Sequence, residues 1–525
     1  MATDLDQARL QDLIRDSPSW YKSPSLIKLY LLLVAPLLTS TAWGFDNSLT
    51  NGLQSVNAFM ENFGHPSGSR LGFFGAAASV GGIVACIIGG PLTERFGRRS
   101  MCSIGAALVI AMAFMETYAT NFEMFTGGKI LLGFGAFFQQ ITAPVLVTEL
   151  AHPKQRVAIT SIYNTSIFLG LVIGSWVTFG TYRIESNWSW KIPCLLQIAI
   201  PVYQAVMIWF CPESPRWLVS KGRIEEARAI LIKYHGNGVE NEIVRYEMQE
   251  IIAGIEADKT ILKFSDFQGI KDTFSRKGNL MRLWLCMATA VGSQSIGGGF
   301  MASYLPLILD QIGMTTEKEK TLVNALLNIF NWCVAFLSAL IIPHLGRRTI
   351  FLISSVGVNV TFIIWTALSA RYDITEQKSL GIAILVMIVA GSFFVCICWI
   401  PLVIAYPLET VTTKQRSIYF AITMFTINCT SFITSYIHPI GIENLGWRYY
   451  IITAVWNAIM LLVVYFTFVE TKGKTLEEIA SLFDGDERFI NAAIAVGHDL
   501  DKKDQIDHVE EADKEPAVAE KPWSK

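Results

Sequence analysis

The sequence predicts an all-α membrane protein with twelve membrane-spanning helices in two pseudo-symmetric halves of six. The chain of 525 residues is 52% hydrophobic and only 16% charged, whereas soluble proteins carry about 25% charged residues. The apolar residues gather in twelve separate runs, each long enough to cross a hydrocarbon core of about 30 Å. Charged motifs that follow the second and fourth runs recur after the eighth and tenth, which indicates a duplicated unit.

Each apolar run is expected to form one transmembrane helix, because about twenty residues at about 1.5 Å each span the membrane core. Several runs contain Pro or Gly, which a helix bundle tolerates. In chain order, the expected helices cover about residues 28–48, 71–92, 101–119, 125–148, 157–180, 191–211, 281–309, 321–343, 349–369, 380–408, 417–437 and 447–469.

The two halves meet at residues 212–218, which read PESPRWL. Two prolines three residues apart cannot lie inside one regular helix, so the sixth apolar run ends there. The residues that follow are rich in charge and have helical patterning, and they should form surface helices. The expected organisation is an N-terminal segment 1–27, a first bundle 28–211, a linker 212–280, a second bundle 281–470 and a C-terminal tail 471–525.

Lysine and arginine in the short loops predict the orientation of the chain. These bases concentrate in the loops after spans 2, 4, 8 and 10, whereas bases in the opposite loops are mixed with acids. Both termini and the linker are therefore expected in the cytoplasm, with the plasma membrane as the location. No cleavable signal peptide is present, so the first span should direct insertion. Asn187 begins a glycosylation sequon in an outer loop close to the membrane.

Matching charges follow equivalent spans of the two halves. Gly-Arg-Arg occurs at 97–99 and 346–348, and a Glu and an Arg seven residues apart follow spans 4 and 10. One such motif alone would be only a positive-inside anchor, but the duplication favours a charge network at the cytoplasmic helix ends. Each pair near water contributes about 0–1 kcal/mol, which suits contacts that hold the halves together and reopen. The candidates for this cytoplasmic gate are Glu94, Arg98, Arg99, Glu149, Arg156, Glu213, Arg216, Arg347, Arg348, Glu409, Arg416 and Glu470.

These motifs together resemble the sugar porter family of the major facilitator superfamily. The resemblance also includes PESPRWL and the sequence ETKGKTLEEI at 470–479, and it runs from span 1 to just past span 12. It implies the major facilitator fold, transport by alternating access and no cofactor. Segments most similar to the fungal lactose permease and cellodextrin transporter branch, which imply a disaccharide, are 162–164, 190–193, 405–409 and 438–447.

The chain departs from the family pattern at several positions. Glu94 and Pro343 stand where aspartate is usual, and Lys129 replaces an arginine. In span 7, Gln294 is followed by three glycines, 297–299, instead of an asparagine. Because span 7 contributes ligand contacts in this family, a hexose or a non-sugar metabolite stays open as the cargo.

Four amide side chains are expected near the middle of the membrane. Counted from the helix ends at about 1.5 Å per residue, Asn164 lies about 12 Å deep, and Gln294, Asn331 and Asn428 about 18 Å. Amides both donate and accept hydrogen bonds, so they suit sugar hydroxyls, and we interpret these four as substrate contacts. The alternative is that each amide joins neighbouring helices.

Other residues in the spans are interpreted separately. Asn324 and Asn328 are expected to hold helices together. The glycines 297–299 would let span 7 unwind or bend beside Gln294 and act as a gate on its outer half, and the alternative is close helix packing. Trp399 and Phe45 are candidates for stacking against a sugar ring.

Asp46 and Lys129 are the charges that lie most nearly inside spans of the first half. Counted from the cytoplasmic ends, they reach about 27 Å and about 30 Å, so they share one depth. An unpaired charge in a span costs at least about 2.5–3.5 kcal/mol, so partners are expected. The alternative is that both mark the ends of their spans. Gly44-Phe45-Asp46 resembles the Gly-Tyr-Asp of proton-coupled sugar porters, which implies that Asp46 binds the proton and pairs with Lys129 when ionised.

The predicted function is secondary active transport of a sugar with protons across a lipid bilayer by a monomer. The alternatives are a transporter of a hexose or a non-sugar metabolite, and a nutrient sensor that does not transport. An enzyme is not expected, since no nucleophile–base pair, phosphate loop or metal cluster is legible. The nine cysteines include no Cys-x-x-Cys, so they indicate neither a metal site nor a disulfide framework. A net charge of −2 gives no indication of a nucleic-acid partner.

Overall fold

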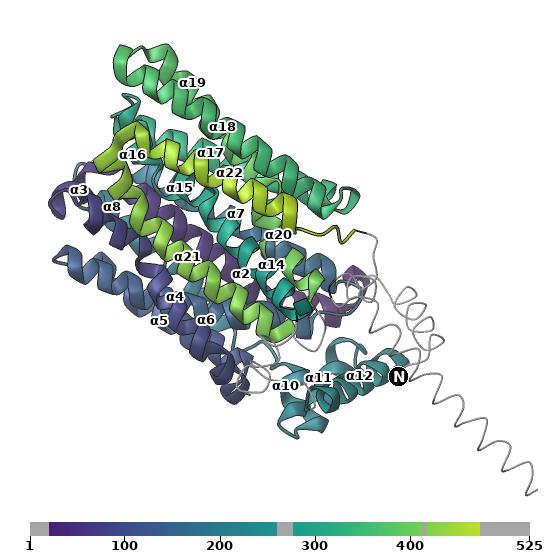
Figure 1. Cartoon of the computed structure of the whole chain (residues 1–525). Coiled ribbons are helices and arrows are strands. Elements are labelled where there is room, and N and C mark those ends of the chain that lie inside the picture. The colour runs from purple at the N-terminus through teal and green to yellow at the C-terminus, as the bar shows by residue number, and fades with distance from the viewer. Residues whose placement is uncertain (1–19, 260–276, 412–415, 473–482, 484–525) are drawn as a thin grey trace, which may run out of the picture.

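The computed structural model describes residues 20–259, 277–411, 416–472 and 483, and the expectations for residues 1–19 and for most of the tail lie outside them. Within these residues the regular structure is helical. Figure 1 shows long helices packed side by side, with a small group of shorter helices at one end of the bundle.

The first half has six long helical segments and a short connecting helix. They are α2 (Pro24–Leu53), the short α3 (Asn57–Asn62), α4 (Gly68–Phe96), α5 (Arg98–Thr117), α6 (Phe122–Leu150), α7 (Arg156–Thr181), and the consecutive pair α8 (Trp188–Leu196) and α9 (Ala199–Met207). The linker forms α10 (Pro215–Ser220), α11 (Ile224–Tyr234) and α12 (Glu242–Lys259).

The second half repeats this arrangement with more breaks. Its helices are α14 (Lys277–Ser295), α15 (Gly298–Ser303), α16 (Leu305–Gln311), α17 (Glu317–Ile341), α18 (Arg347–Thr375), α19 (Lys378–Cys396), α20 (Trp399–Thr410), α21 (Arg416–Leu445) and α22 (Tyr449–Thr467). Single 3-10 turns lie at η1 (Trp20–Lys22), η2 (Ile342–His344) and η3 (Gly446–Arg448).

Each of the twelve predicted spans coincides with one helix or with consecutive helices. Nine helical stretches in the described part of the chain are long and apolar enough to cross a membrane, and the last of them contains both α21 and α22. The two spans outside this set are interrupted, one between α8 and α9 and the other between α14 and α16. The fold class predicted from the sequence is therefore confirmed.

The break after α14 lies at the predicted triple glycine. Gly297 has φ of +103°, a left-handed conformation that favours glycine. A Cβ atom at this position would also lie 2.5 Å from the ring of Phe362. Gly297 therefore ends the helix and also permits close packing, and its role in a gate stays a prediction.

The two halves contact each other along two pairs of long helices, α4 with α21 and α7 with α17. The linker helices α10–α12 lie at one end of the bundle, which we call the linker end. Helices α3 and α16 lie at the opposite end, which we call the far end (Figure 1). Trp399 and Phe45 are 0% and 4% exposed and belong to the apolar cores of their halves. The prediction that they stack on a ligand is therefore wrong for this conformation.

Candidate functional site

A buried ion pair lies inside the first half. The Nζ atom of Lys129 on α6 is 2.5 Å from Oδ1 of Asp46 on α2, and the two side chains are 2% and 7% exposed. The predicted contact is thus present, and neither residue merely marks the end of a span. Removing one partner would leave an uncompensated buried charge, so each residue compensates the charge of the other.

A third ionisable residue, Glu116 on α5, completes this site and was not recognised from the sequence. Its side chain is 0% exposed, and it interacts electrostatically with both Asp46 and Lys129. Glu116 follows Arg98 by eighteen residues, or about 27 Å, which is the depth of Asp46. Counting depth for every carboxylate would have found it. Its place three residues from the expected end of span 3 made it look like a boundary residue.

A small cavity adjoins the ion pair. Its volume is about 20 Å³, and its polar lining residues are Thr39, Asp46, Gln139 and Gln197. This volume is large enough for one water molecule with several polar partners. On the linker side of the cavity, Gln139 donates to Gln204 over 3.1 Å, and Gln204 donates to Thr39 over 2.8 Å. Buried polar groups therefore continue from the ion pair toward the linker end.

Asn164 points toward the bundle interior and is nonetheless exposed. Consecutive helical residues are about 100° apart, so Asn164 lies about 160–180° around α7 from Ile162 and Ile173, which are 54% and 40% exposed on the outer face. Asn164 is itself exposed. It therefore lines interior space that is open to solvent.

Asn331 on α17 lies across the boundary between the halves from Asn164. Phe168, Val334 and Ala335 form a buried apolar contact between α7 and α17. Asn164 precedes Phe168 by one helical turn, and Asn331 precedes the other two by one turn. The Oδ1 atom of Asn331 is buried and has no hydrogen-bond partner in the described part of the chain. These two amides thus flank one contact between the halves.

The other two predicted amides make different contacts in this conformation. Asn428 is 1% exposed and donates to the carbonyl of Met424 and to the sulfur of Cys86 on α4, at 2.9 and 3.6 Å. It connects α21 with α4, which is the alternative role of holding helices together. Gln294 is half-buried and donates to Ser293 over 3.2 Å. Depth alone predicted all four alike, but Asn428 is engaged between helices whereas Asn164 is exposed.

Among the described residues, four hydrogen bonds connect the halves at the far end. Asn51 on α2 donates to Asn324 on α17 over 3.0 Å, so Asn324 holds helices together as expected, whereas Asn328 donates to the same oxygen over 3.3 Å within α17 itself. Gln54 donates to the carbonyl of Ser303 over 3.0 Å. The remaining two bonds join Asn57 to Glu317 and Ser67 to Glu443.

Tyr304 reinforces this closure. It lies at the junction of α15 and α16 in the second half, but it is 0% exposed and packs in the aromatic core of the first half. Its hydroxyl donates to the carbonyl of Ser435 over 2.6 Å and lies so close to Gly75 of α4 that no Cβ would fit there. The far end is therefore shut by an aromatic side chain as well as by hydrogen bonds.

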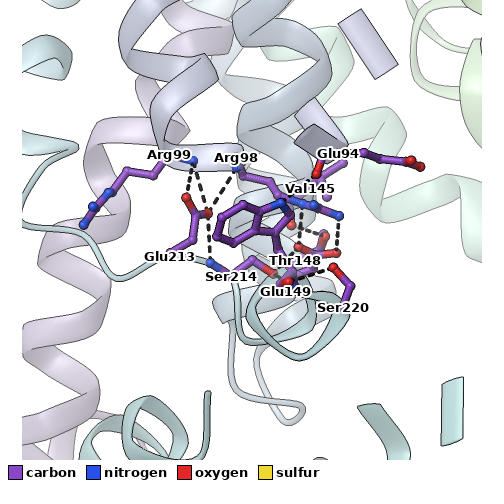
Figure 2. Close-up of polar contacts among 10 residues, drawn as sticks. Glu94, Arg98, Arg99, Val145, Thr148, Glu149, Glu213, Ser214 and Ser220 are labelled. Atoms are coloured by element: carbon purple, nitrogen blue, oxygen red, sulfur yellow. Dashed lines mark hydrogen bonds and ion pairs between the residues drawn. The ribbon is translucent and has the colours of Figure 1, made fainter. Parts of the chain in front are cut away.

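The charges at the linker end of the first half form a compact network (Figure 2). The carboxylate of Glu213 accepts hydrogen bonds from the backbone N–H groups of Arg98 and Arg99, at 3.1 and 3.2 Å. These groups open α5, where a negative charge is favoured by the helix dipole. The guanidinium of Arg98 lies 3.2 Å from Glu149, which also accepts a hydrogen bond from Ser214.

The second half repeats this network with equivalent residues. Glu470 accepts from the backbone N–H groups of Arg347 and Arg348 at the start of α18, at 2.6 and 3.1 Å. The guanidinium of Arg347 lies 3.3 Å from Glu409, which accepts from Thr471 over 2.6 Å. Two segments 257 residues apart, at 213–214 and 470–471, thus play one role in the two halves.

In this conformation each of these contacts joins helix ends of the same half, so the role of these charges in holding the halves together when the linker end shuts stays a prediction. Among the other predicted gate residues, the carbonyl of Glu94 accepts from Trp217 over 2.9 Å, and Arg216 lies beside Gly254 of α12. The Nε atom of Arg156 is buried without a hydrogen-bond partner in the described structure. The side chain of Arg416 lies outside the described residues.

The linker helices are attached to the first half through two histidines. His235 lies 2.6 Å from the carboxylate of Glu247 and 3.1 Å from the carbonyl of Leu150 at the end of α6. The ring of His152, in the turn after α6, lies 5.2 Å from that of His235. Burial, together with the neighbouring His235, lowers the pKa of His152 to about 4. His152 is therefore neutral near pH 7.

Comparison with known proteins gives one consistent result. The sequence pattern of the family described as "Sugar (and other) transporter" matches residues 32–483. A high-affinity glucose transporter of Kluyveromyces lactis is 25% identical over 492 residues, which cover 90% of this chain and 88% of that protein. The MFS-type transporter oryC of Aspergillus oryzae is 25% identical over 90% of this chain and 87% of its own.

Among solved structures, the inward open conformation of the xylose transporter XylE from E. coli has the same fold. The TM-score is 0.72 at 20% identity, and the match covers 87% of this chain and all of that one. The name of the K. lactis relative refers to glucose and that of the E. coli structure to xylose, whereas oryC is named only as an MFS-type transporter.

Proposed function

Because the chain belongs to the sugar (and other) transporter family, we propose that it carries a sugar together with a proton across the membrane by alternating access. Membership in this family makes it a multi-pass membrane transporter of the major facilitator superfamily and not an enzyme. The coupling to protons, the sugar and the orientation are the parts that we add. One chain contains both halves, so a monomer would suffice.

The arrangement of the halves supports alternating access. Hydrogen bonds such as that between Gln54 and Ser303 tie the halves together at the far end, where Tyr304 is also buried. Interior residues such as Asn164 are exposed on the side of the linker. The proposed location is the plasma membrane, with the linker and both termini in the cytoplasm. In that orientation this conformation faces inward.

The observation that supports proton coupling is the buried ion pair in which Nζ of Lys129 lies 2.5 Å from Oδ1 of Asp46. Ionised Asp46 would hold Lys129, and protonation of Asp46 would release it and change how α2 packs against α6. One proton moved down a potential of 100 mV provides about 2.3 kcal/mol. That free energy supports roughly fifty-fold accumulation of the cargo.

Substrate contacts are proposed from Asn164, Gln294 and Asn331, whose amides suit sugar hydroxyls. Asn428 would join them only in a state where α21 separates from α4, since its amide is now used between these helices. A disaccharide such as lactose or cellobiose is the proposed cargo, on the resemblance of four segments to the lactose permease branch. A hexose is the second candidate, because the relative from K. lactis is named a glucose transporter.

Transport by the purified protein in liposomes tests the proposal. Radiolabelled lactose, cellobiose, glucose and xylose are offered outside, with the interior more alkaline, in the presence and absence of a protonophore. We expect a disaccharide to accumulate above equilibrium, and the protonophore to abolish that excess. Accumulation that survives the protonophore contradicts proton coupling, uptake of hexoses alone selects the second candidate, and no uptake of any sugar contradicts the function.

A further inference from the structure

Two carboxylates and one ammonium group share the buried site of the first half. Asp46 comes from α2, Lys129 from α6 and Glu116 from α5, and they are 5%, 2% and 0% exposed as whole residues. The remaining titratable group that acts on Lys129 is the thiol of Cys194 on α8. The α9 side chains that face this region, Pro201 and Gln204, are uncharged.

The hydrogen bonds of Glu116 differ from those of Asp46. One carboxylate oxygen, Oε2, accepts a 2.9 Å hydrogen bond from the amide of Gln197. The other oxygen, Oε1, is buried and has no hydrogen-bond partner in the described part of the chain, and neither has Oε1 of Gln197. An ionised carboxylate needs several donors or a cation when it is buried. A protonated Glu116 needs neither, and it gains a donor of its own.

Counting charge leads to the same conclusion. With both carboxylates ionised, one buried negative charge would be left without a counter-ion, which is costly. With one proton on the carboxylates the site is neutral. In the described structure Asp46 holds the ammonium group, so the proton belongs on Glu116.

We propose that Glu116 is a second proton-binding carboxylate of the coupling site, and that Lys129 pairs with whichever of Glu116 and Asp46 is ionised. This inference rests on the proton-coupled function proposed above. In the exchange, the carboxylic proton of Glu116 moves to the carboxylate of Asp46. The ammonium group keeps its three protons and moves to the newly ionised Glu116. No net charge appears, so Lys129 is never left unpaired.

The packing allows both partners to be reached. Gly128 precedes Lys129 on α6, and a Cβ atom on it would lie 3.1 Å from Cγ of Glu116, so the glutamate rests against the backbone beside the lysine. Gln197, which holds Glu116, and Asp46 line the same cavity of about 20 Å³. One water molecule there could bridge the amide of Gln197 and Asp46. Lysine is a compact charge on a flexible stem, and it exchanges partners more easily than an arginine fixed by two parallel bonds.

Glu116→Gln tests this role, because the amide keeps the shape and removes the exchangeable proton. Without the second partner, protonation of Asp46 leaves Lys129 unpaired, so proton binding requires a higher proton concentration. We expect the pH at half-maximal proton-driven uptake to fall by about one unit or more, which is at least a tenfold change in proton affinity. Glu116→Asp should restore much of the wild-type profile.

The matched control is Glu123→Gln, which changes an exposed glutamate on the neighbouring helix that pairs with Arg70. It should leave the pH profile unchanged. Sugar exchange without a gradient shows that each variant is folded and inserted. For a variant that loses this exchange, the protonation of its carboxyl groups is measured instead by infrared difference spectroscopy of the detergent-solubilised protein. There the C=O band of a protonated carboxylic acid near neutral pH should be present in the wild type and absent in Glu116→Gln.

The outcomes separate the inference from the function on which it rests. If the wild type transports sugar without proton coupling, the proposed function fails. If the wild type is coupled and Glu116→Gln keeps both its pH profile and its carboxylic acid band, the role of Glu116 is overturned and the function stands.

Discussion

Asp46→Asn is the substitution that separates coupling from transport. The asparagine keeps the size of the side chain but cannot ionise, so it fixes the site in a state that resembles protonated Asp46. The partner Lys129 is 2% exposed and has its cation 2.5 Å from the lost carboxylate. We expect uphill accumulation to fall from about fifty-fold to about one, the equilibrium value, since the proton no longer drives the cargo. Exchange of sugar across the membrane should continue.

The same substitution has a stability effect that follows from burial. Removing one partner of a buried ion pair costs about 3–5 kcal/mol when the other charge is left unpaired. The loss of stability should be about 5 kcal/mol if Lys129 stays unpaired, and smaller if Lys129 pairs with Glu116 instead. The double variant Asp46→Asn/Lys129→Met removes the unpaired charge, so its stability should recover while its coupling stays lost.

The assay compares these variants with the wild type and with Glu123→Gln in liposomes of one composition. Glu123 pairs with Arg70 at 2.9 Å, but the two side chains are 72% and 52% exposed. Its loss should change stability by no more than about 1 kcal/mol. Initial exchange, gradient-driven accumulation and the temperature of half-inactivation are measured for each protein. Full uphill accumulation by Asp46→Asn would refute the assignment of the buried pair to proton coupling.

Three further predictions concern the ends of the bundle. Gln54→Ala removes the hydrogen bond to Ser303 and should favour opening of the far end by about 0.5–1.5 kcal/mol. A cysteine placed at Ser303 should then be labelled faster, and unchanged labelling would show that this bond does not hold the end shut. Glu213→Gln removes a charge from the start of α5 and should lower stability by about 0.3–2 kcal/mol, read as a lower melting temperature, and an unaltered value would contradict the role of this charge. His152 has a pKa lowered to about 4, so docking of the linker is strongest above about pH 6.5 and weakens as the pH falls toward 4; hydrogen exchange in α11 should rise over that window in the wild type and lose this dependence in His152→Gln.

Most of the fold could be predicted because its signals lie along the chain. Length and hydropathy located the twelve spans, and the three glycines at 297–299 located the break after α14. The duplicated motifs predicted which charges are equivalent, and Glu213 and Glu470 do occupy equivalent places at the starts of α5 and α18.

The site was predicted less completely, because position along a helix gives depth but not direction. Asn428 and Asn331 have similar depths, yet one contacts α4 and the other faces α7. Glu116 was overlooked because it lies near the expected end of span 3; its depth matches that of Asp46, and the packing of α5 against α6 adds that it lies beside Lys129. Ion pairs within a half and between halves use the same residue types, so the sequence could not distinguish them.

The most direct test of the central claim is the movement of protons when sugar is added. Liposomes that contain the protein and a trapped pH-sensitive dye, without any imposed gradient, receive the transported sugar from outside. If sugar and proton enter together, the interior becomes more acidic at a rate that follows sugar entry, and Asp46→Asn abolishes the signal. Entry of labelled sugar with no change in internal pH would contradict the account.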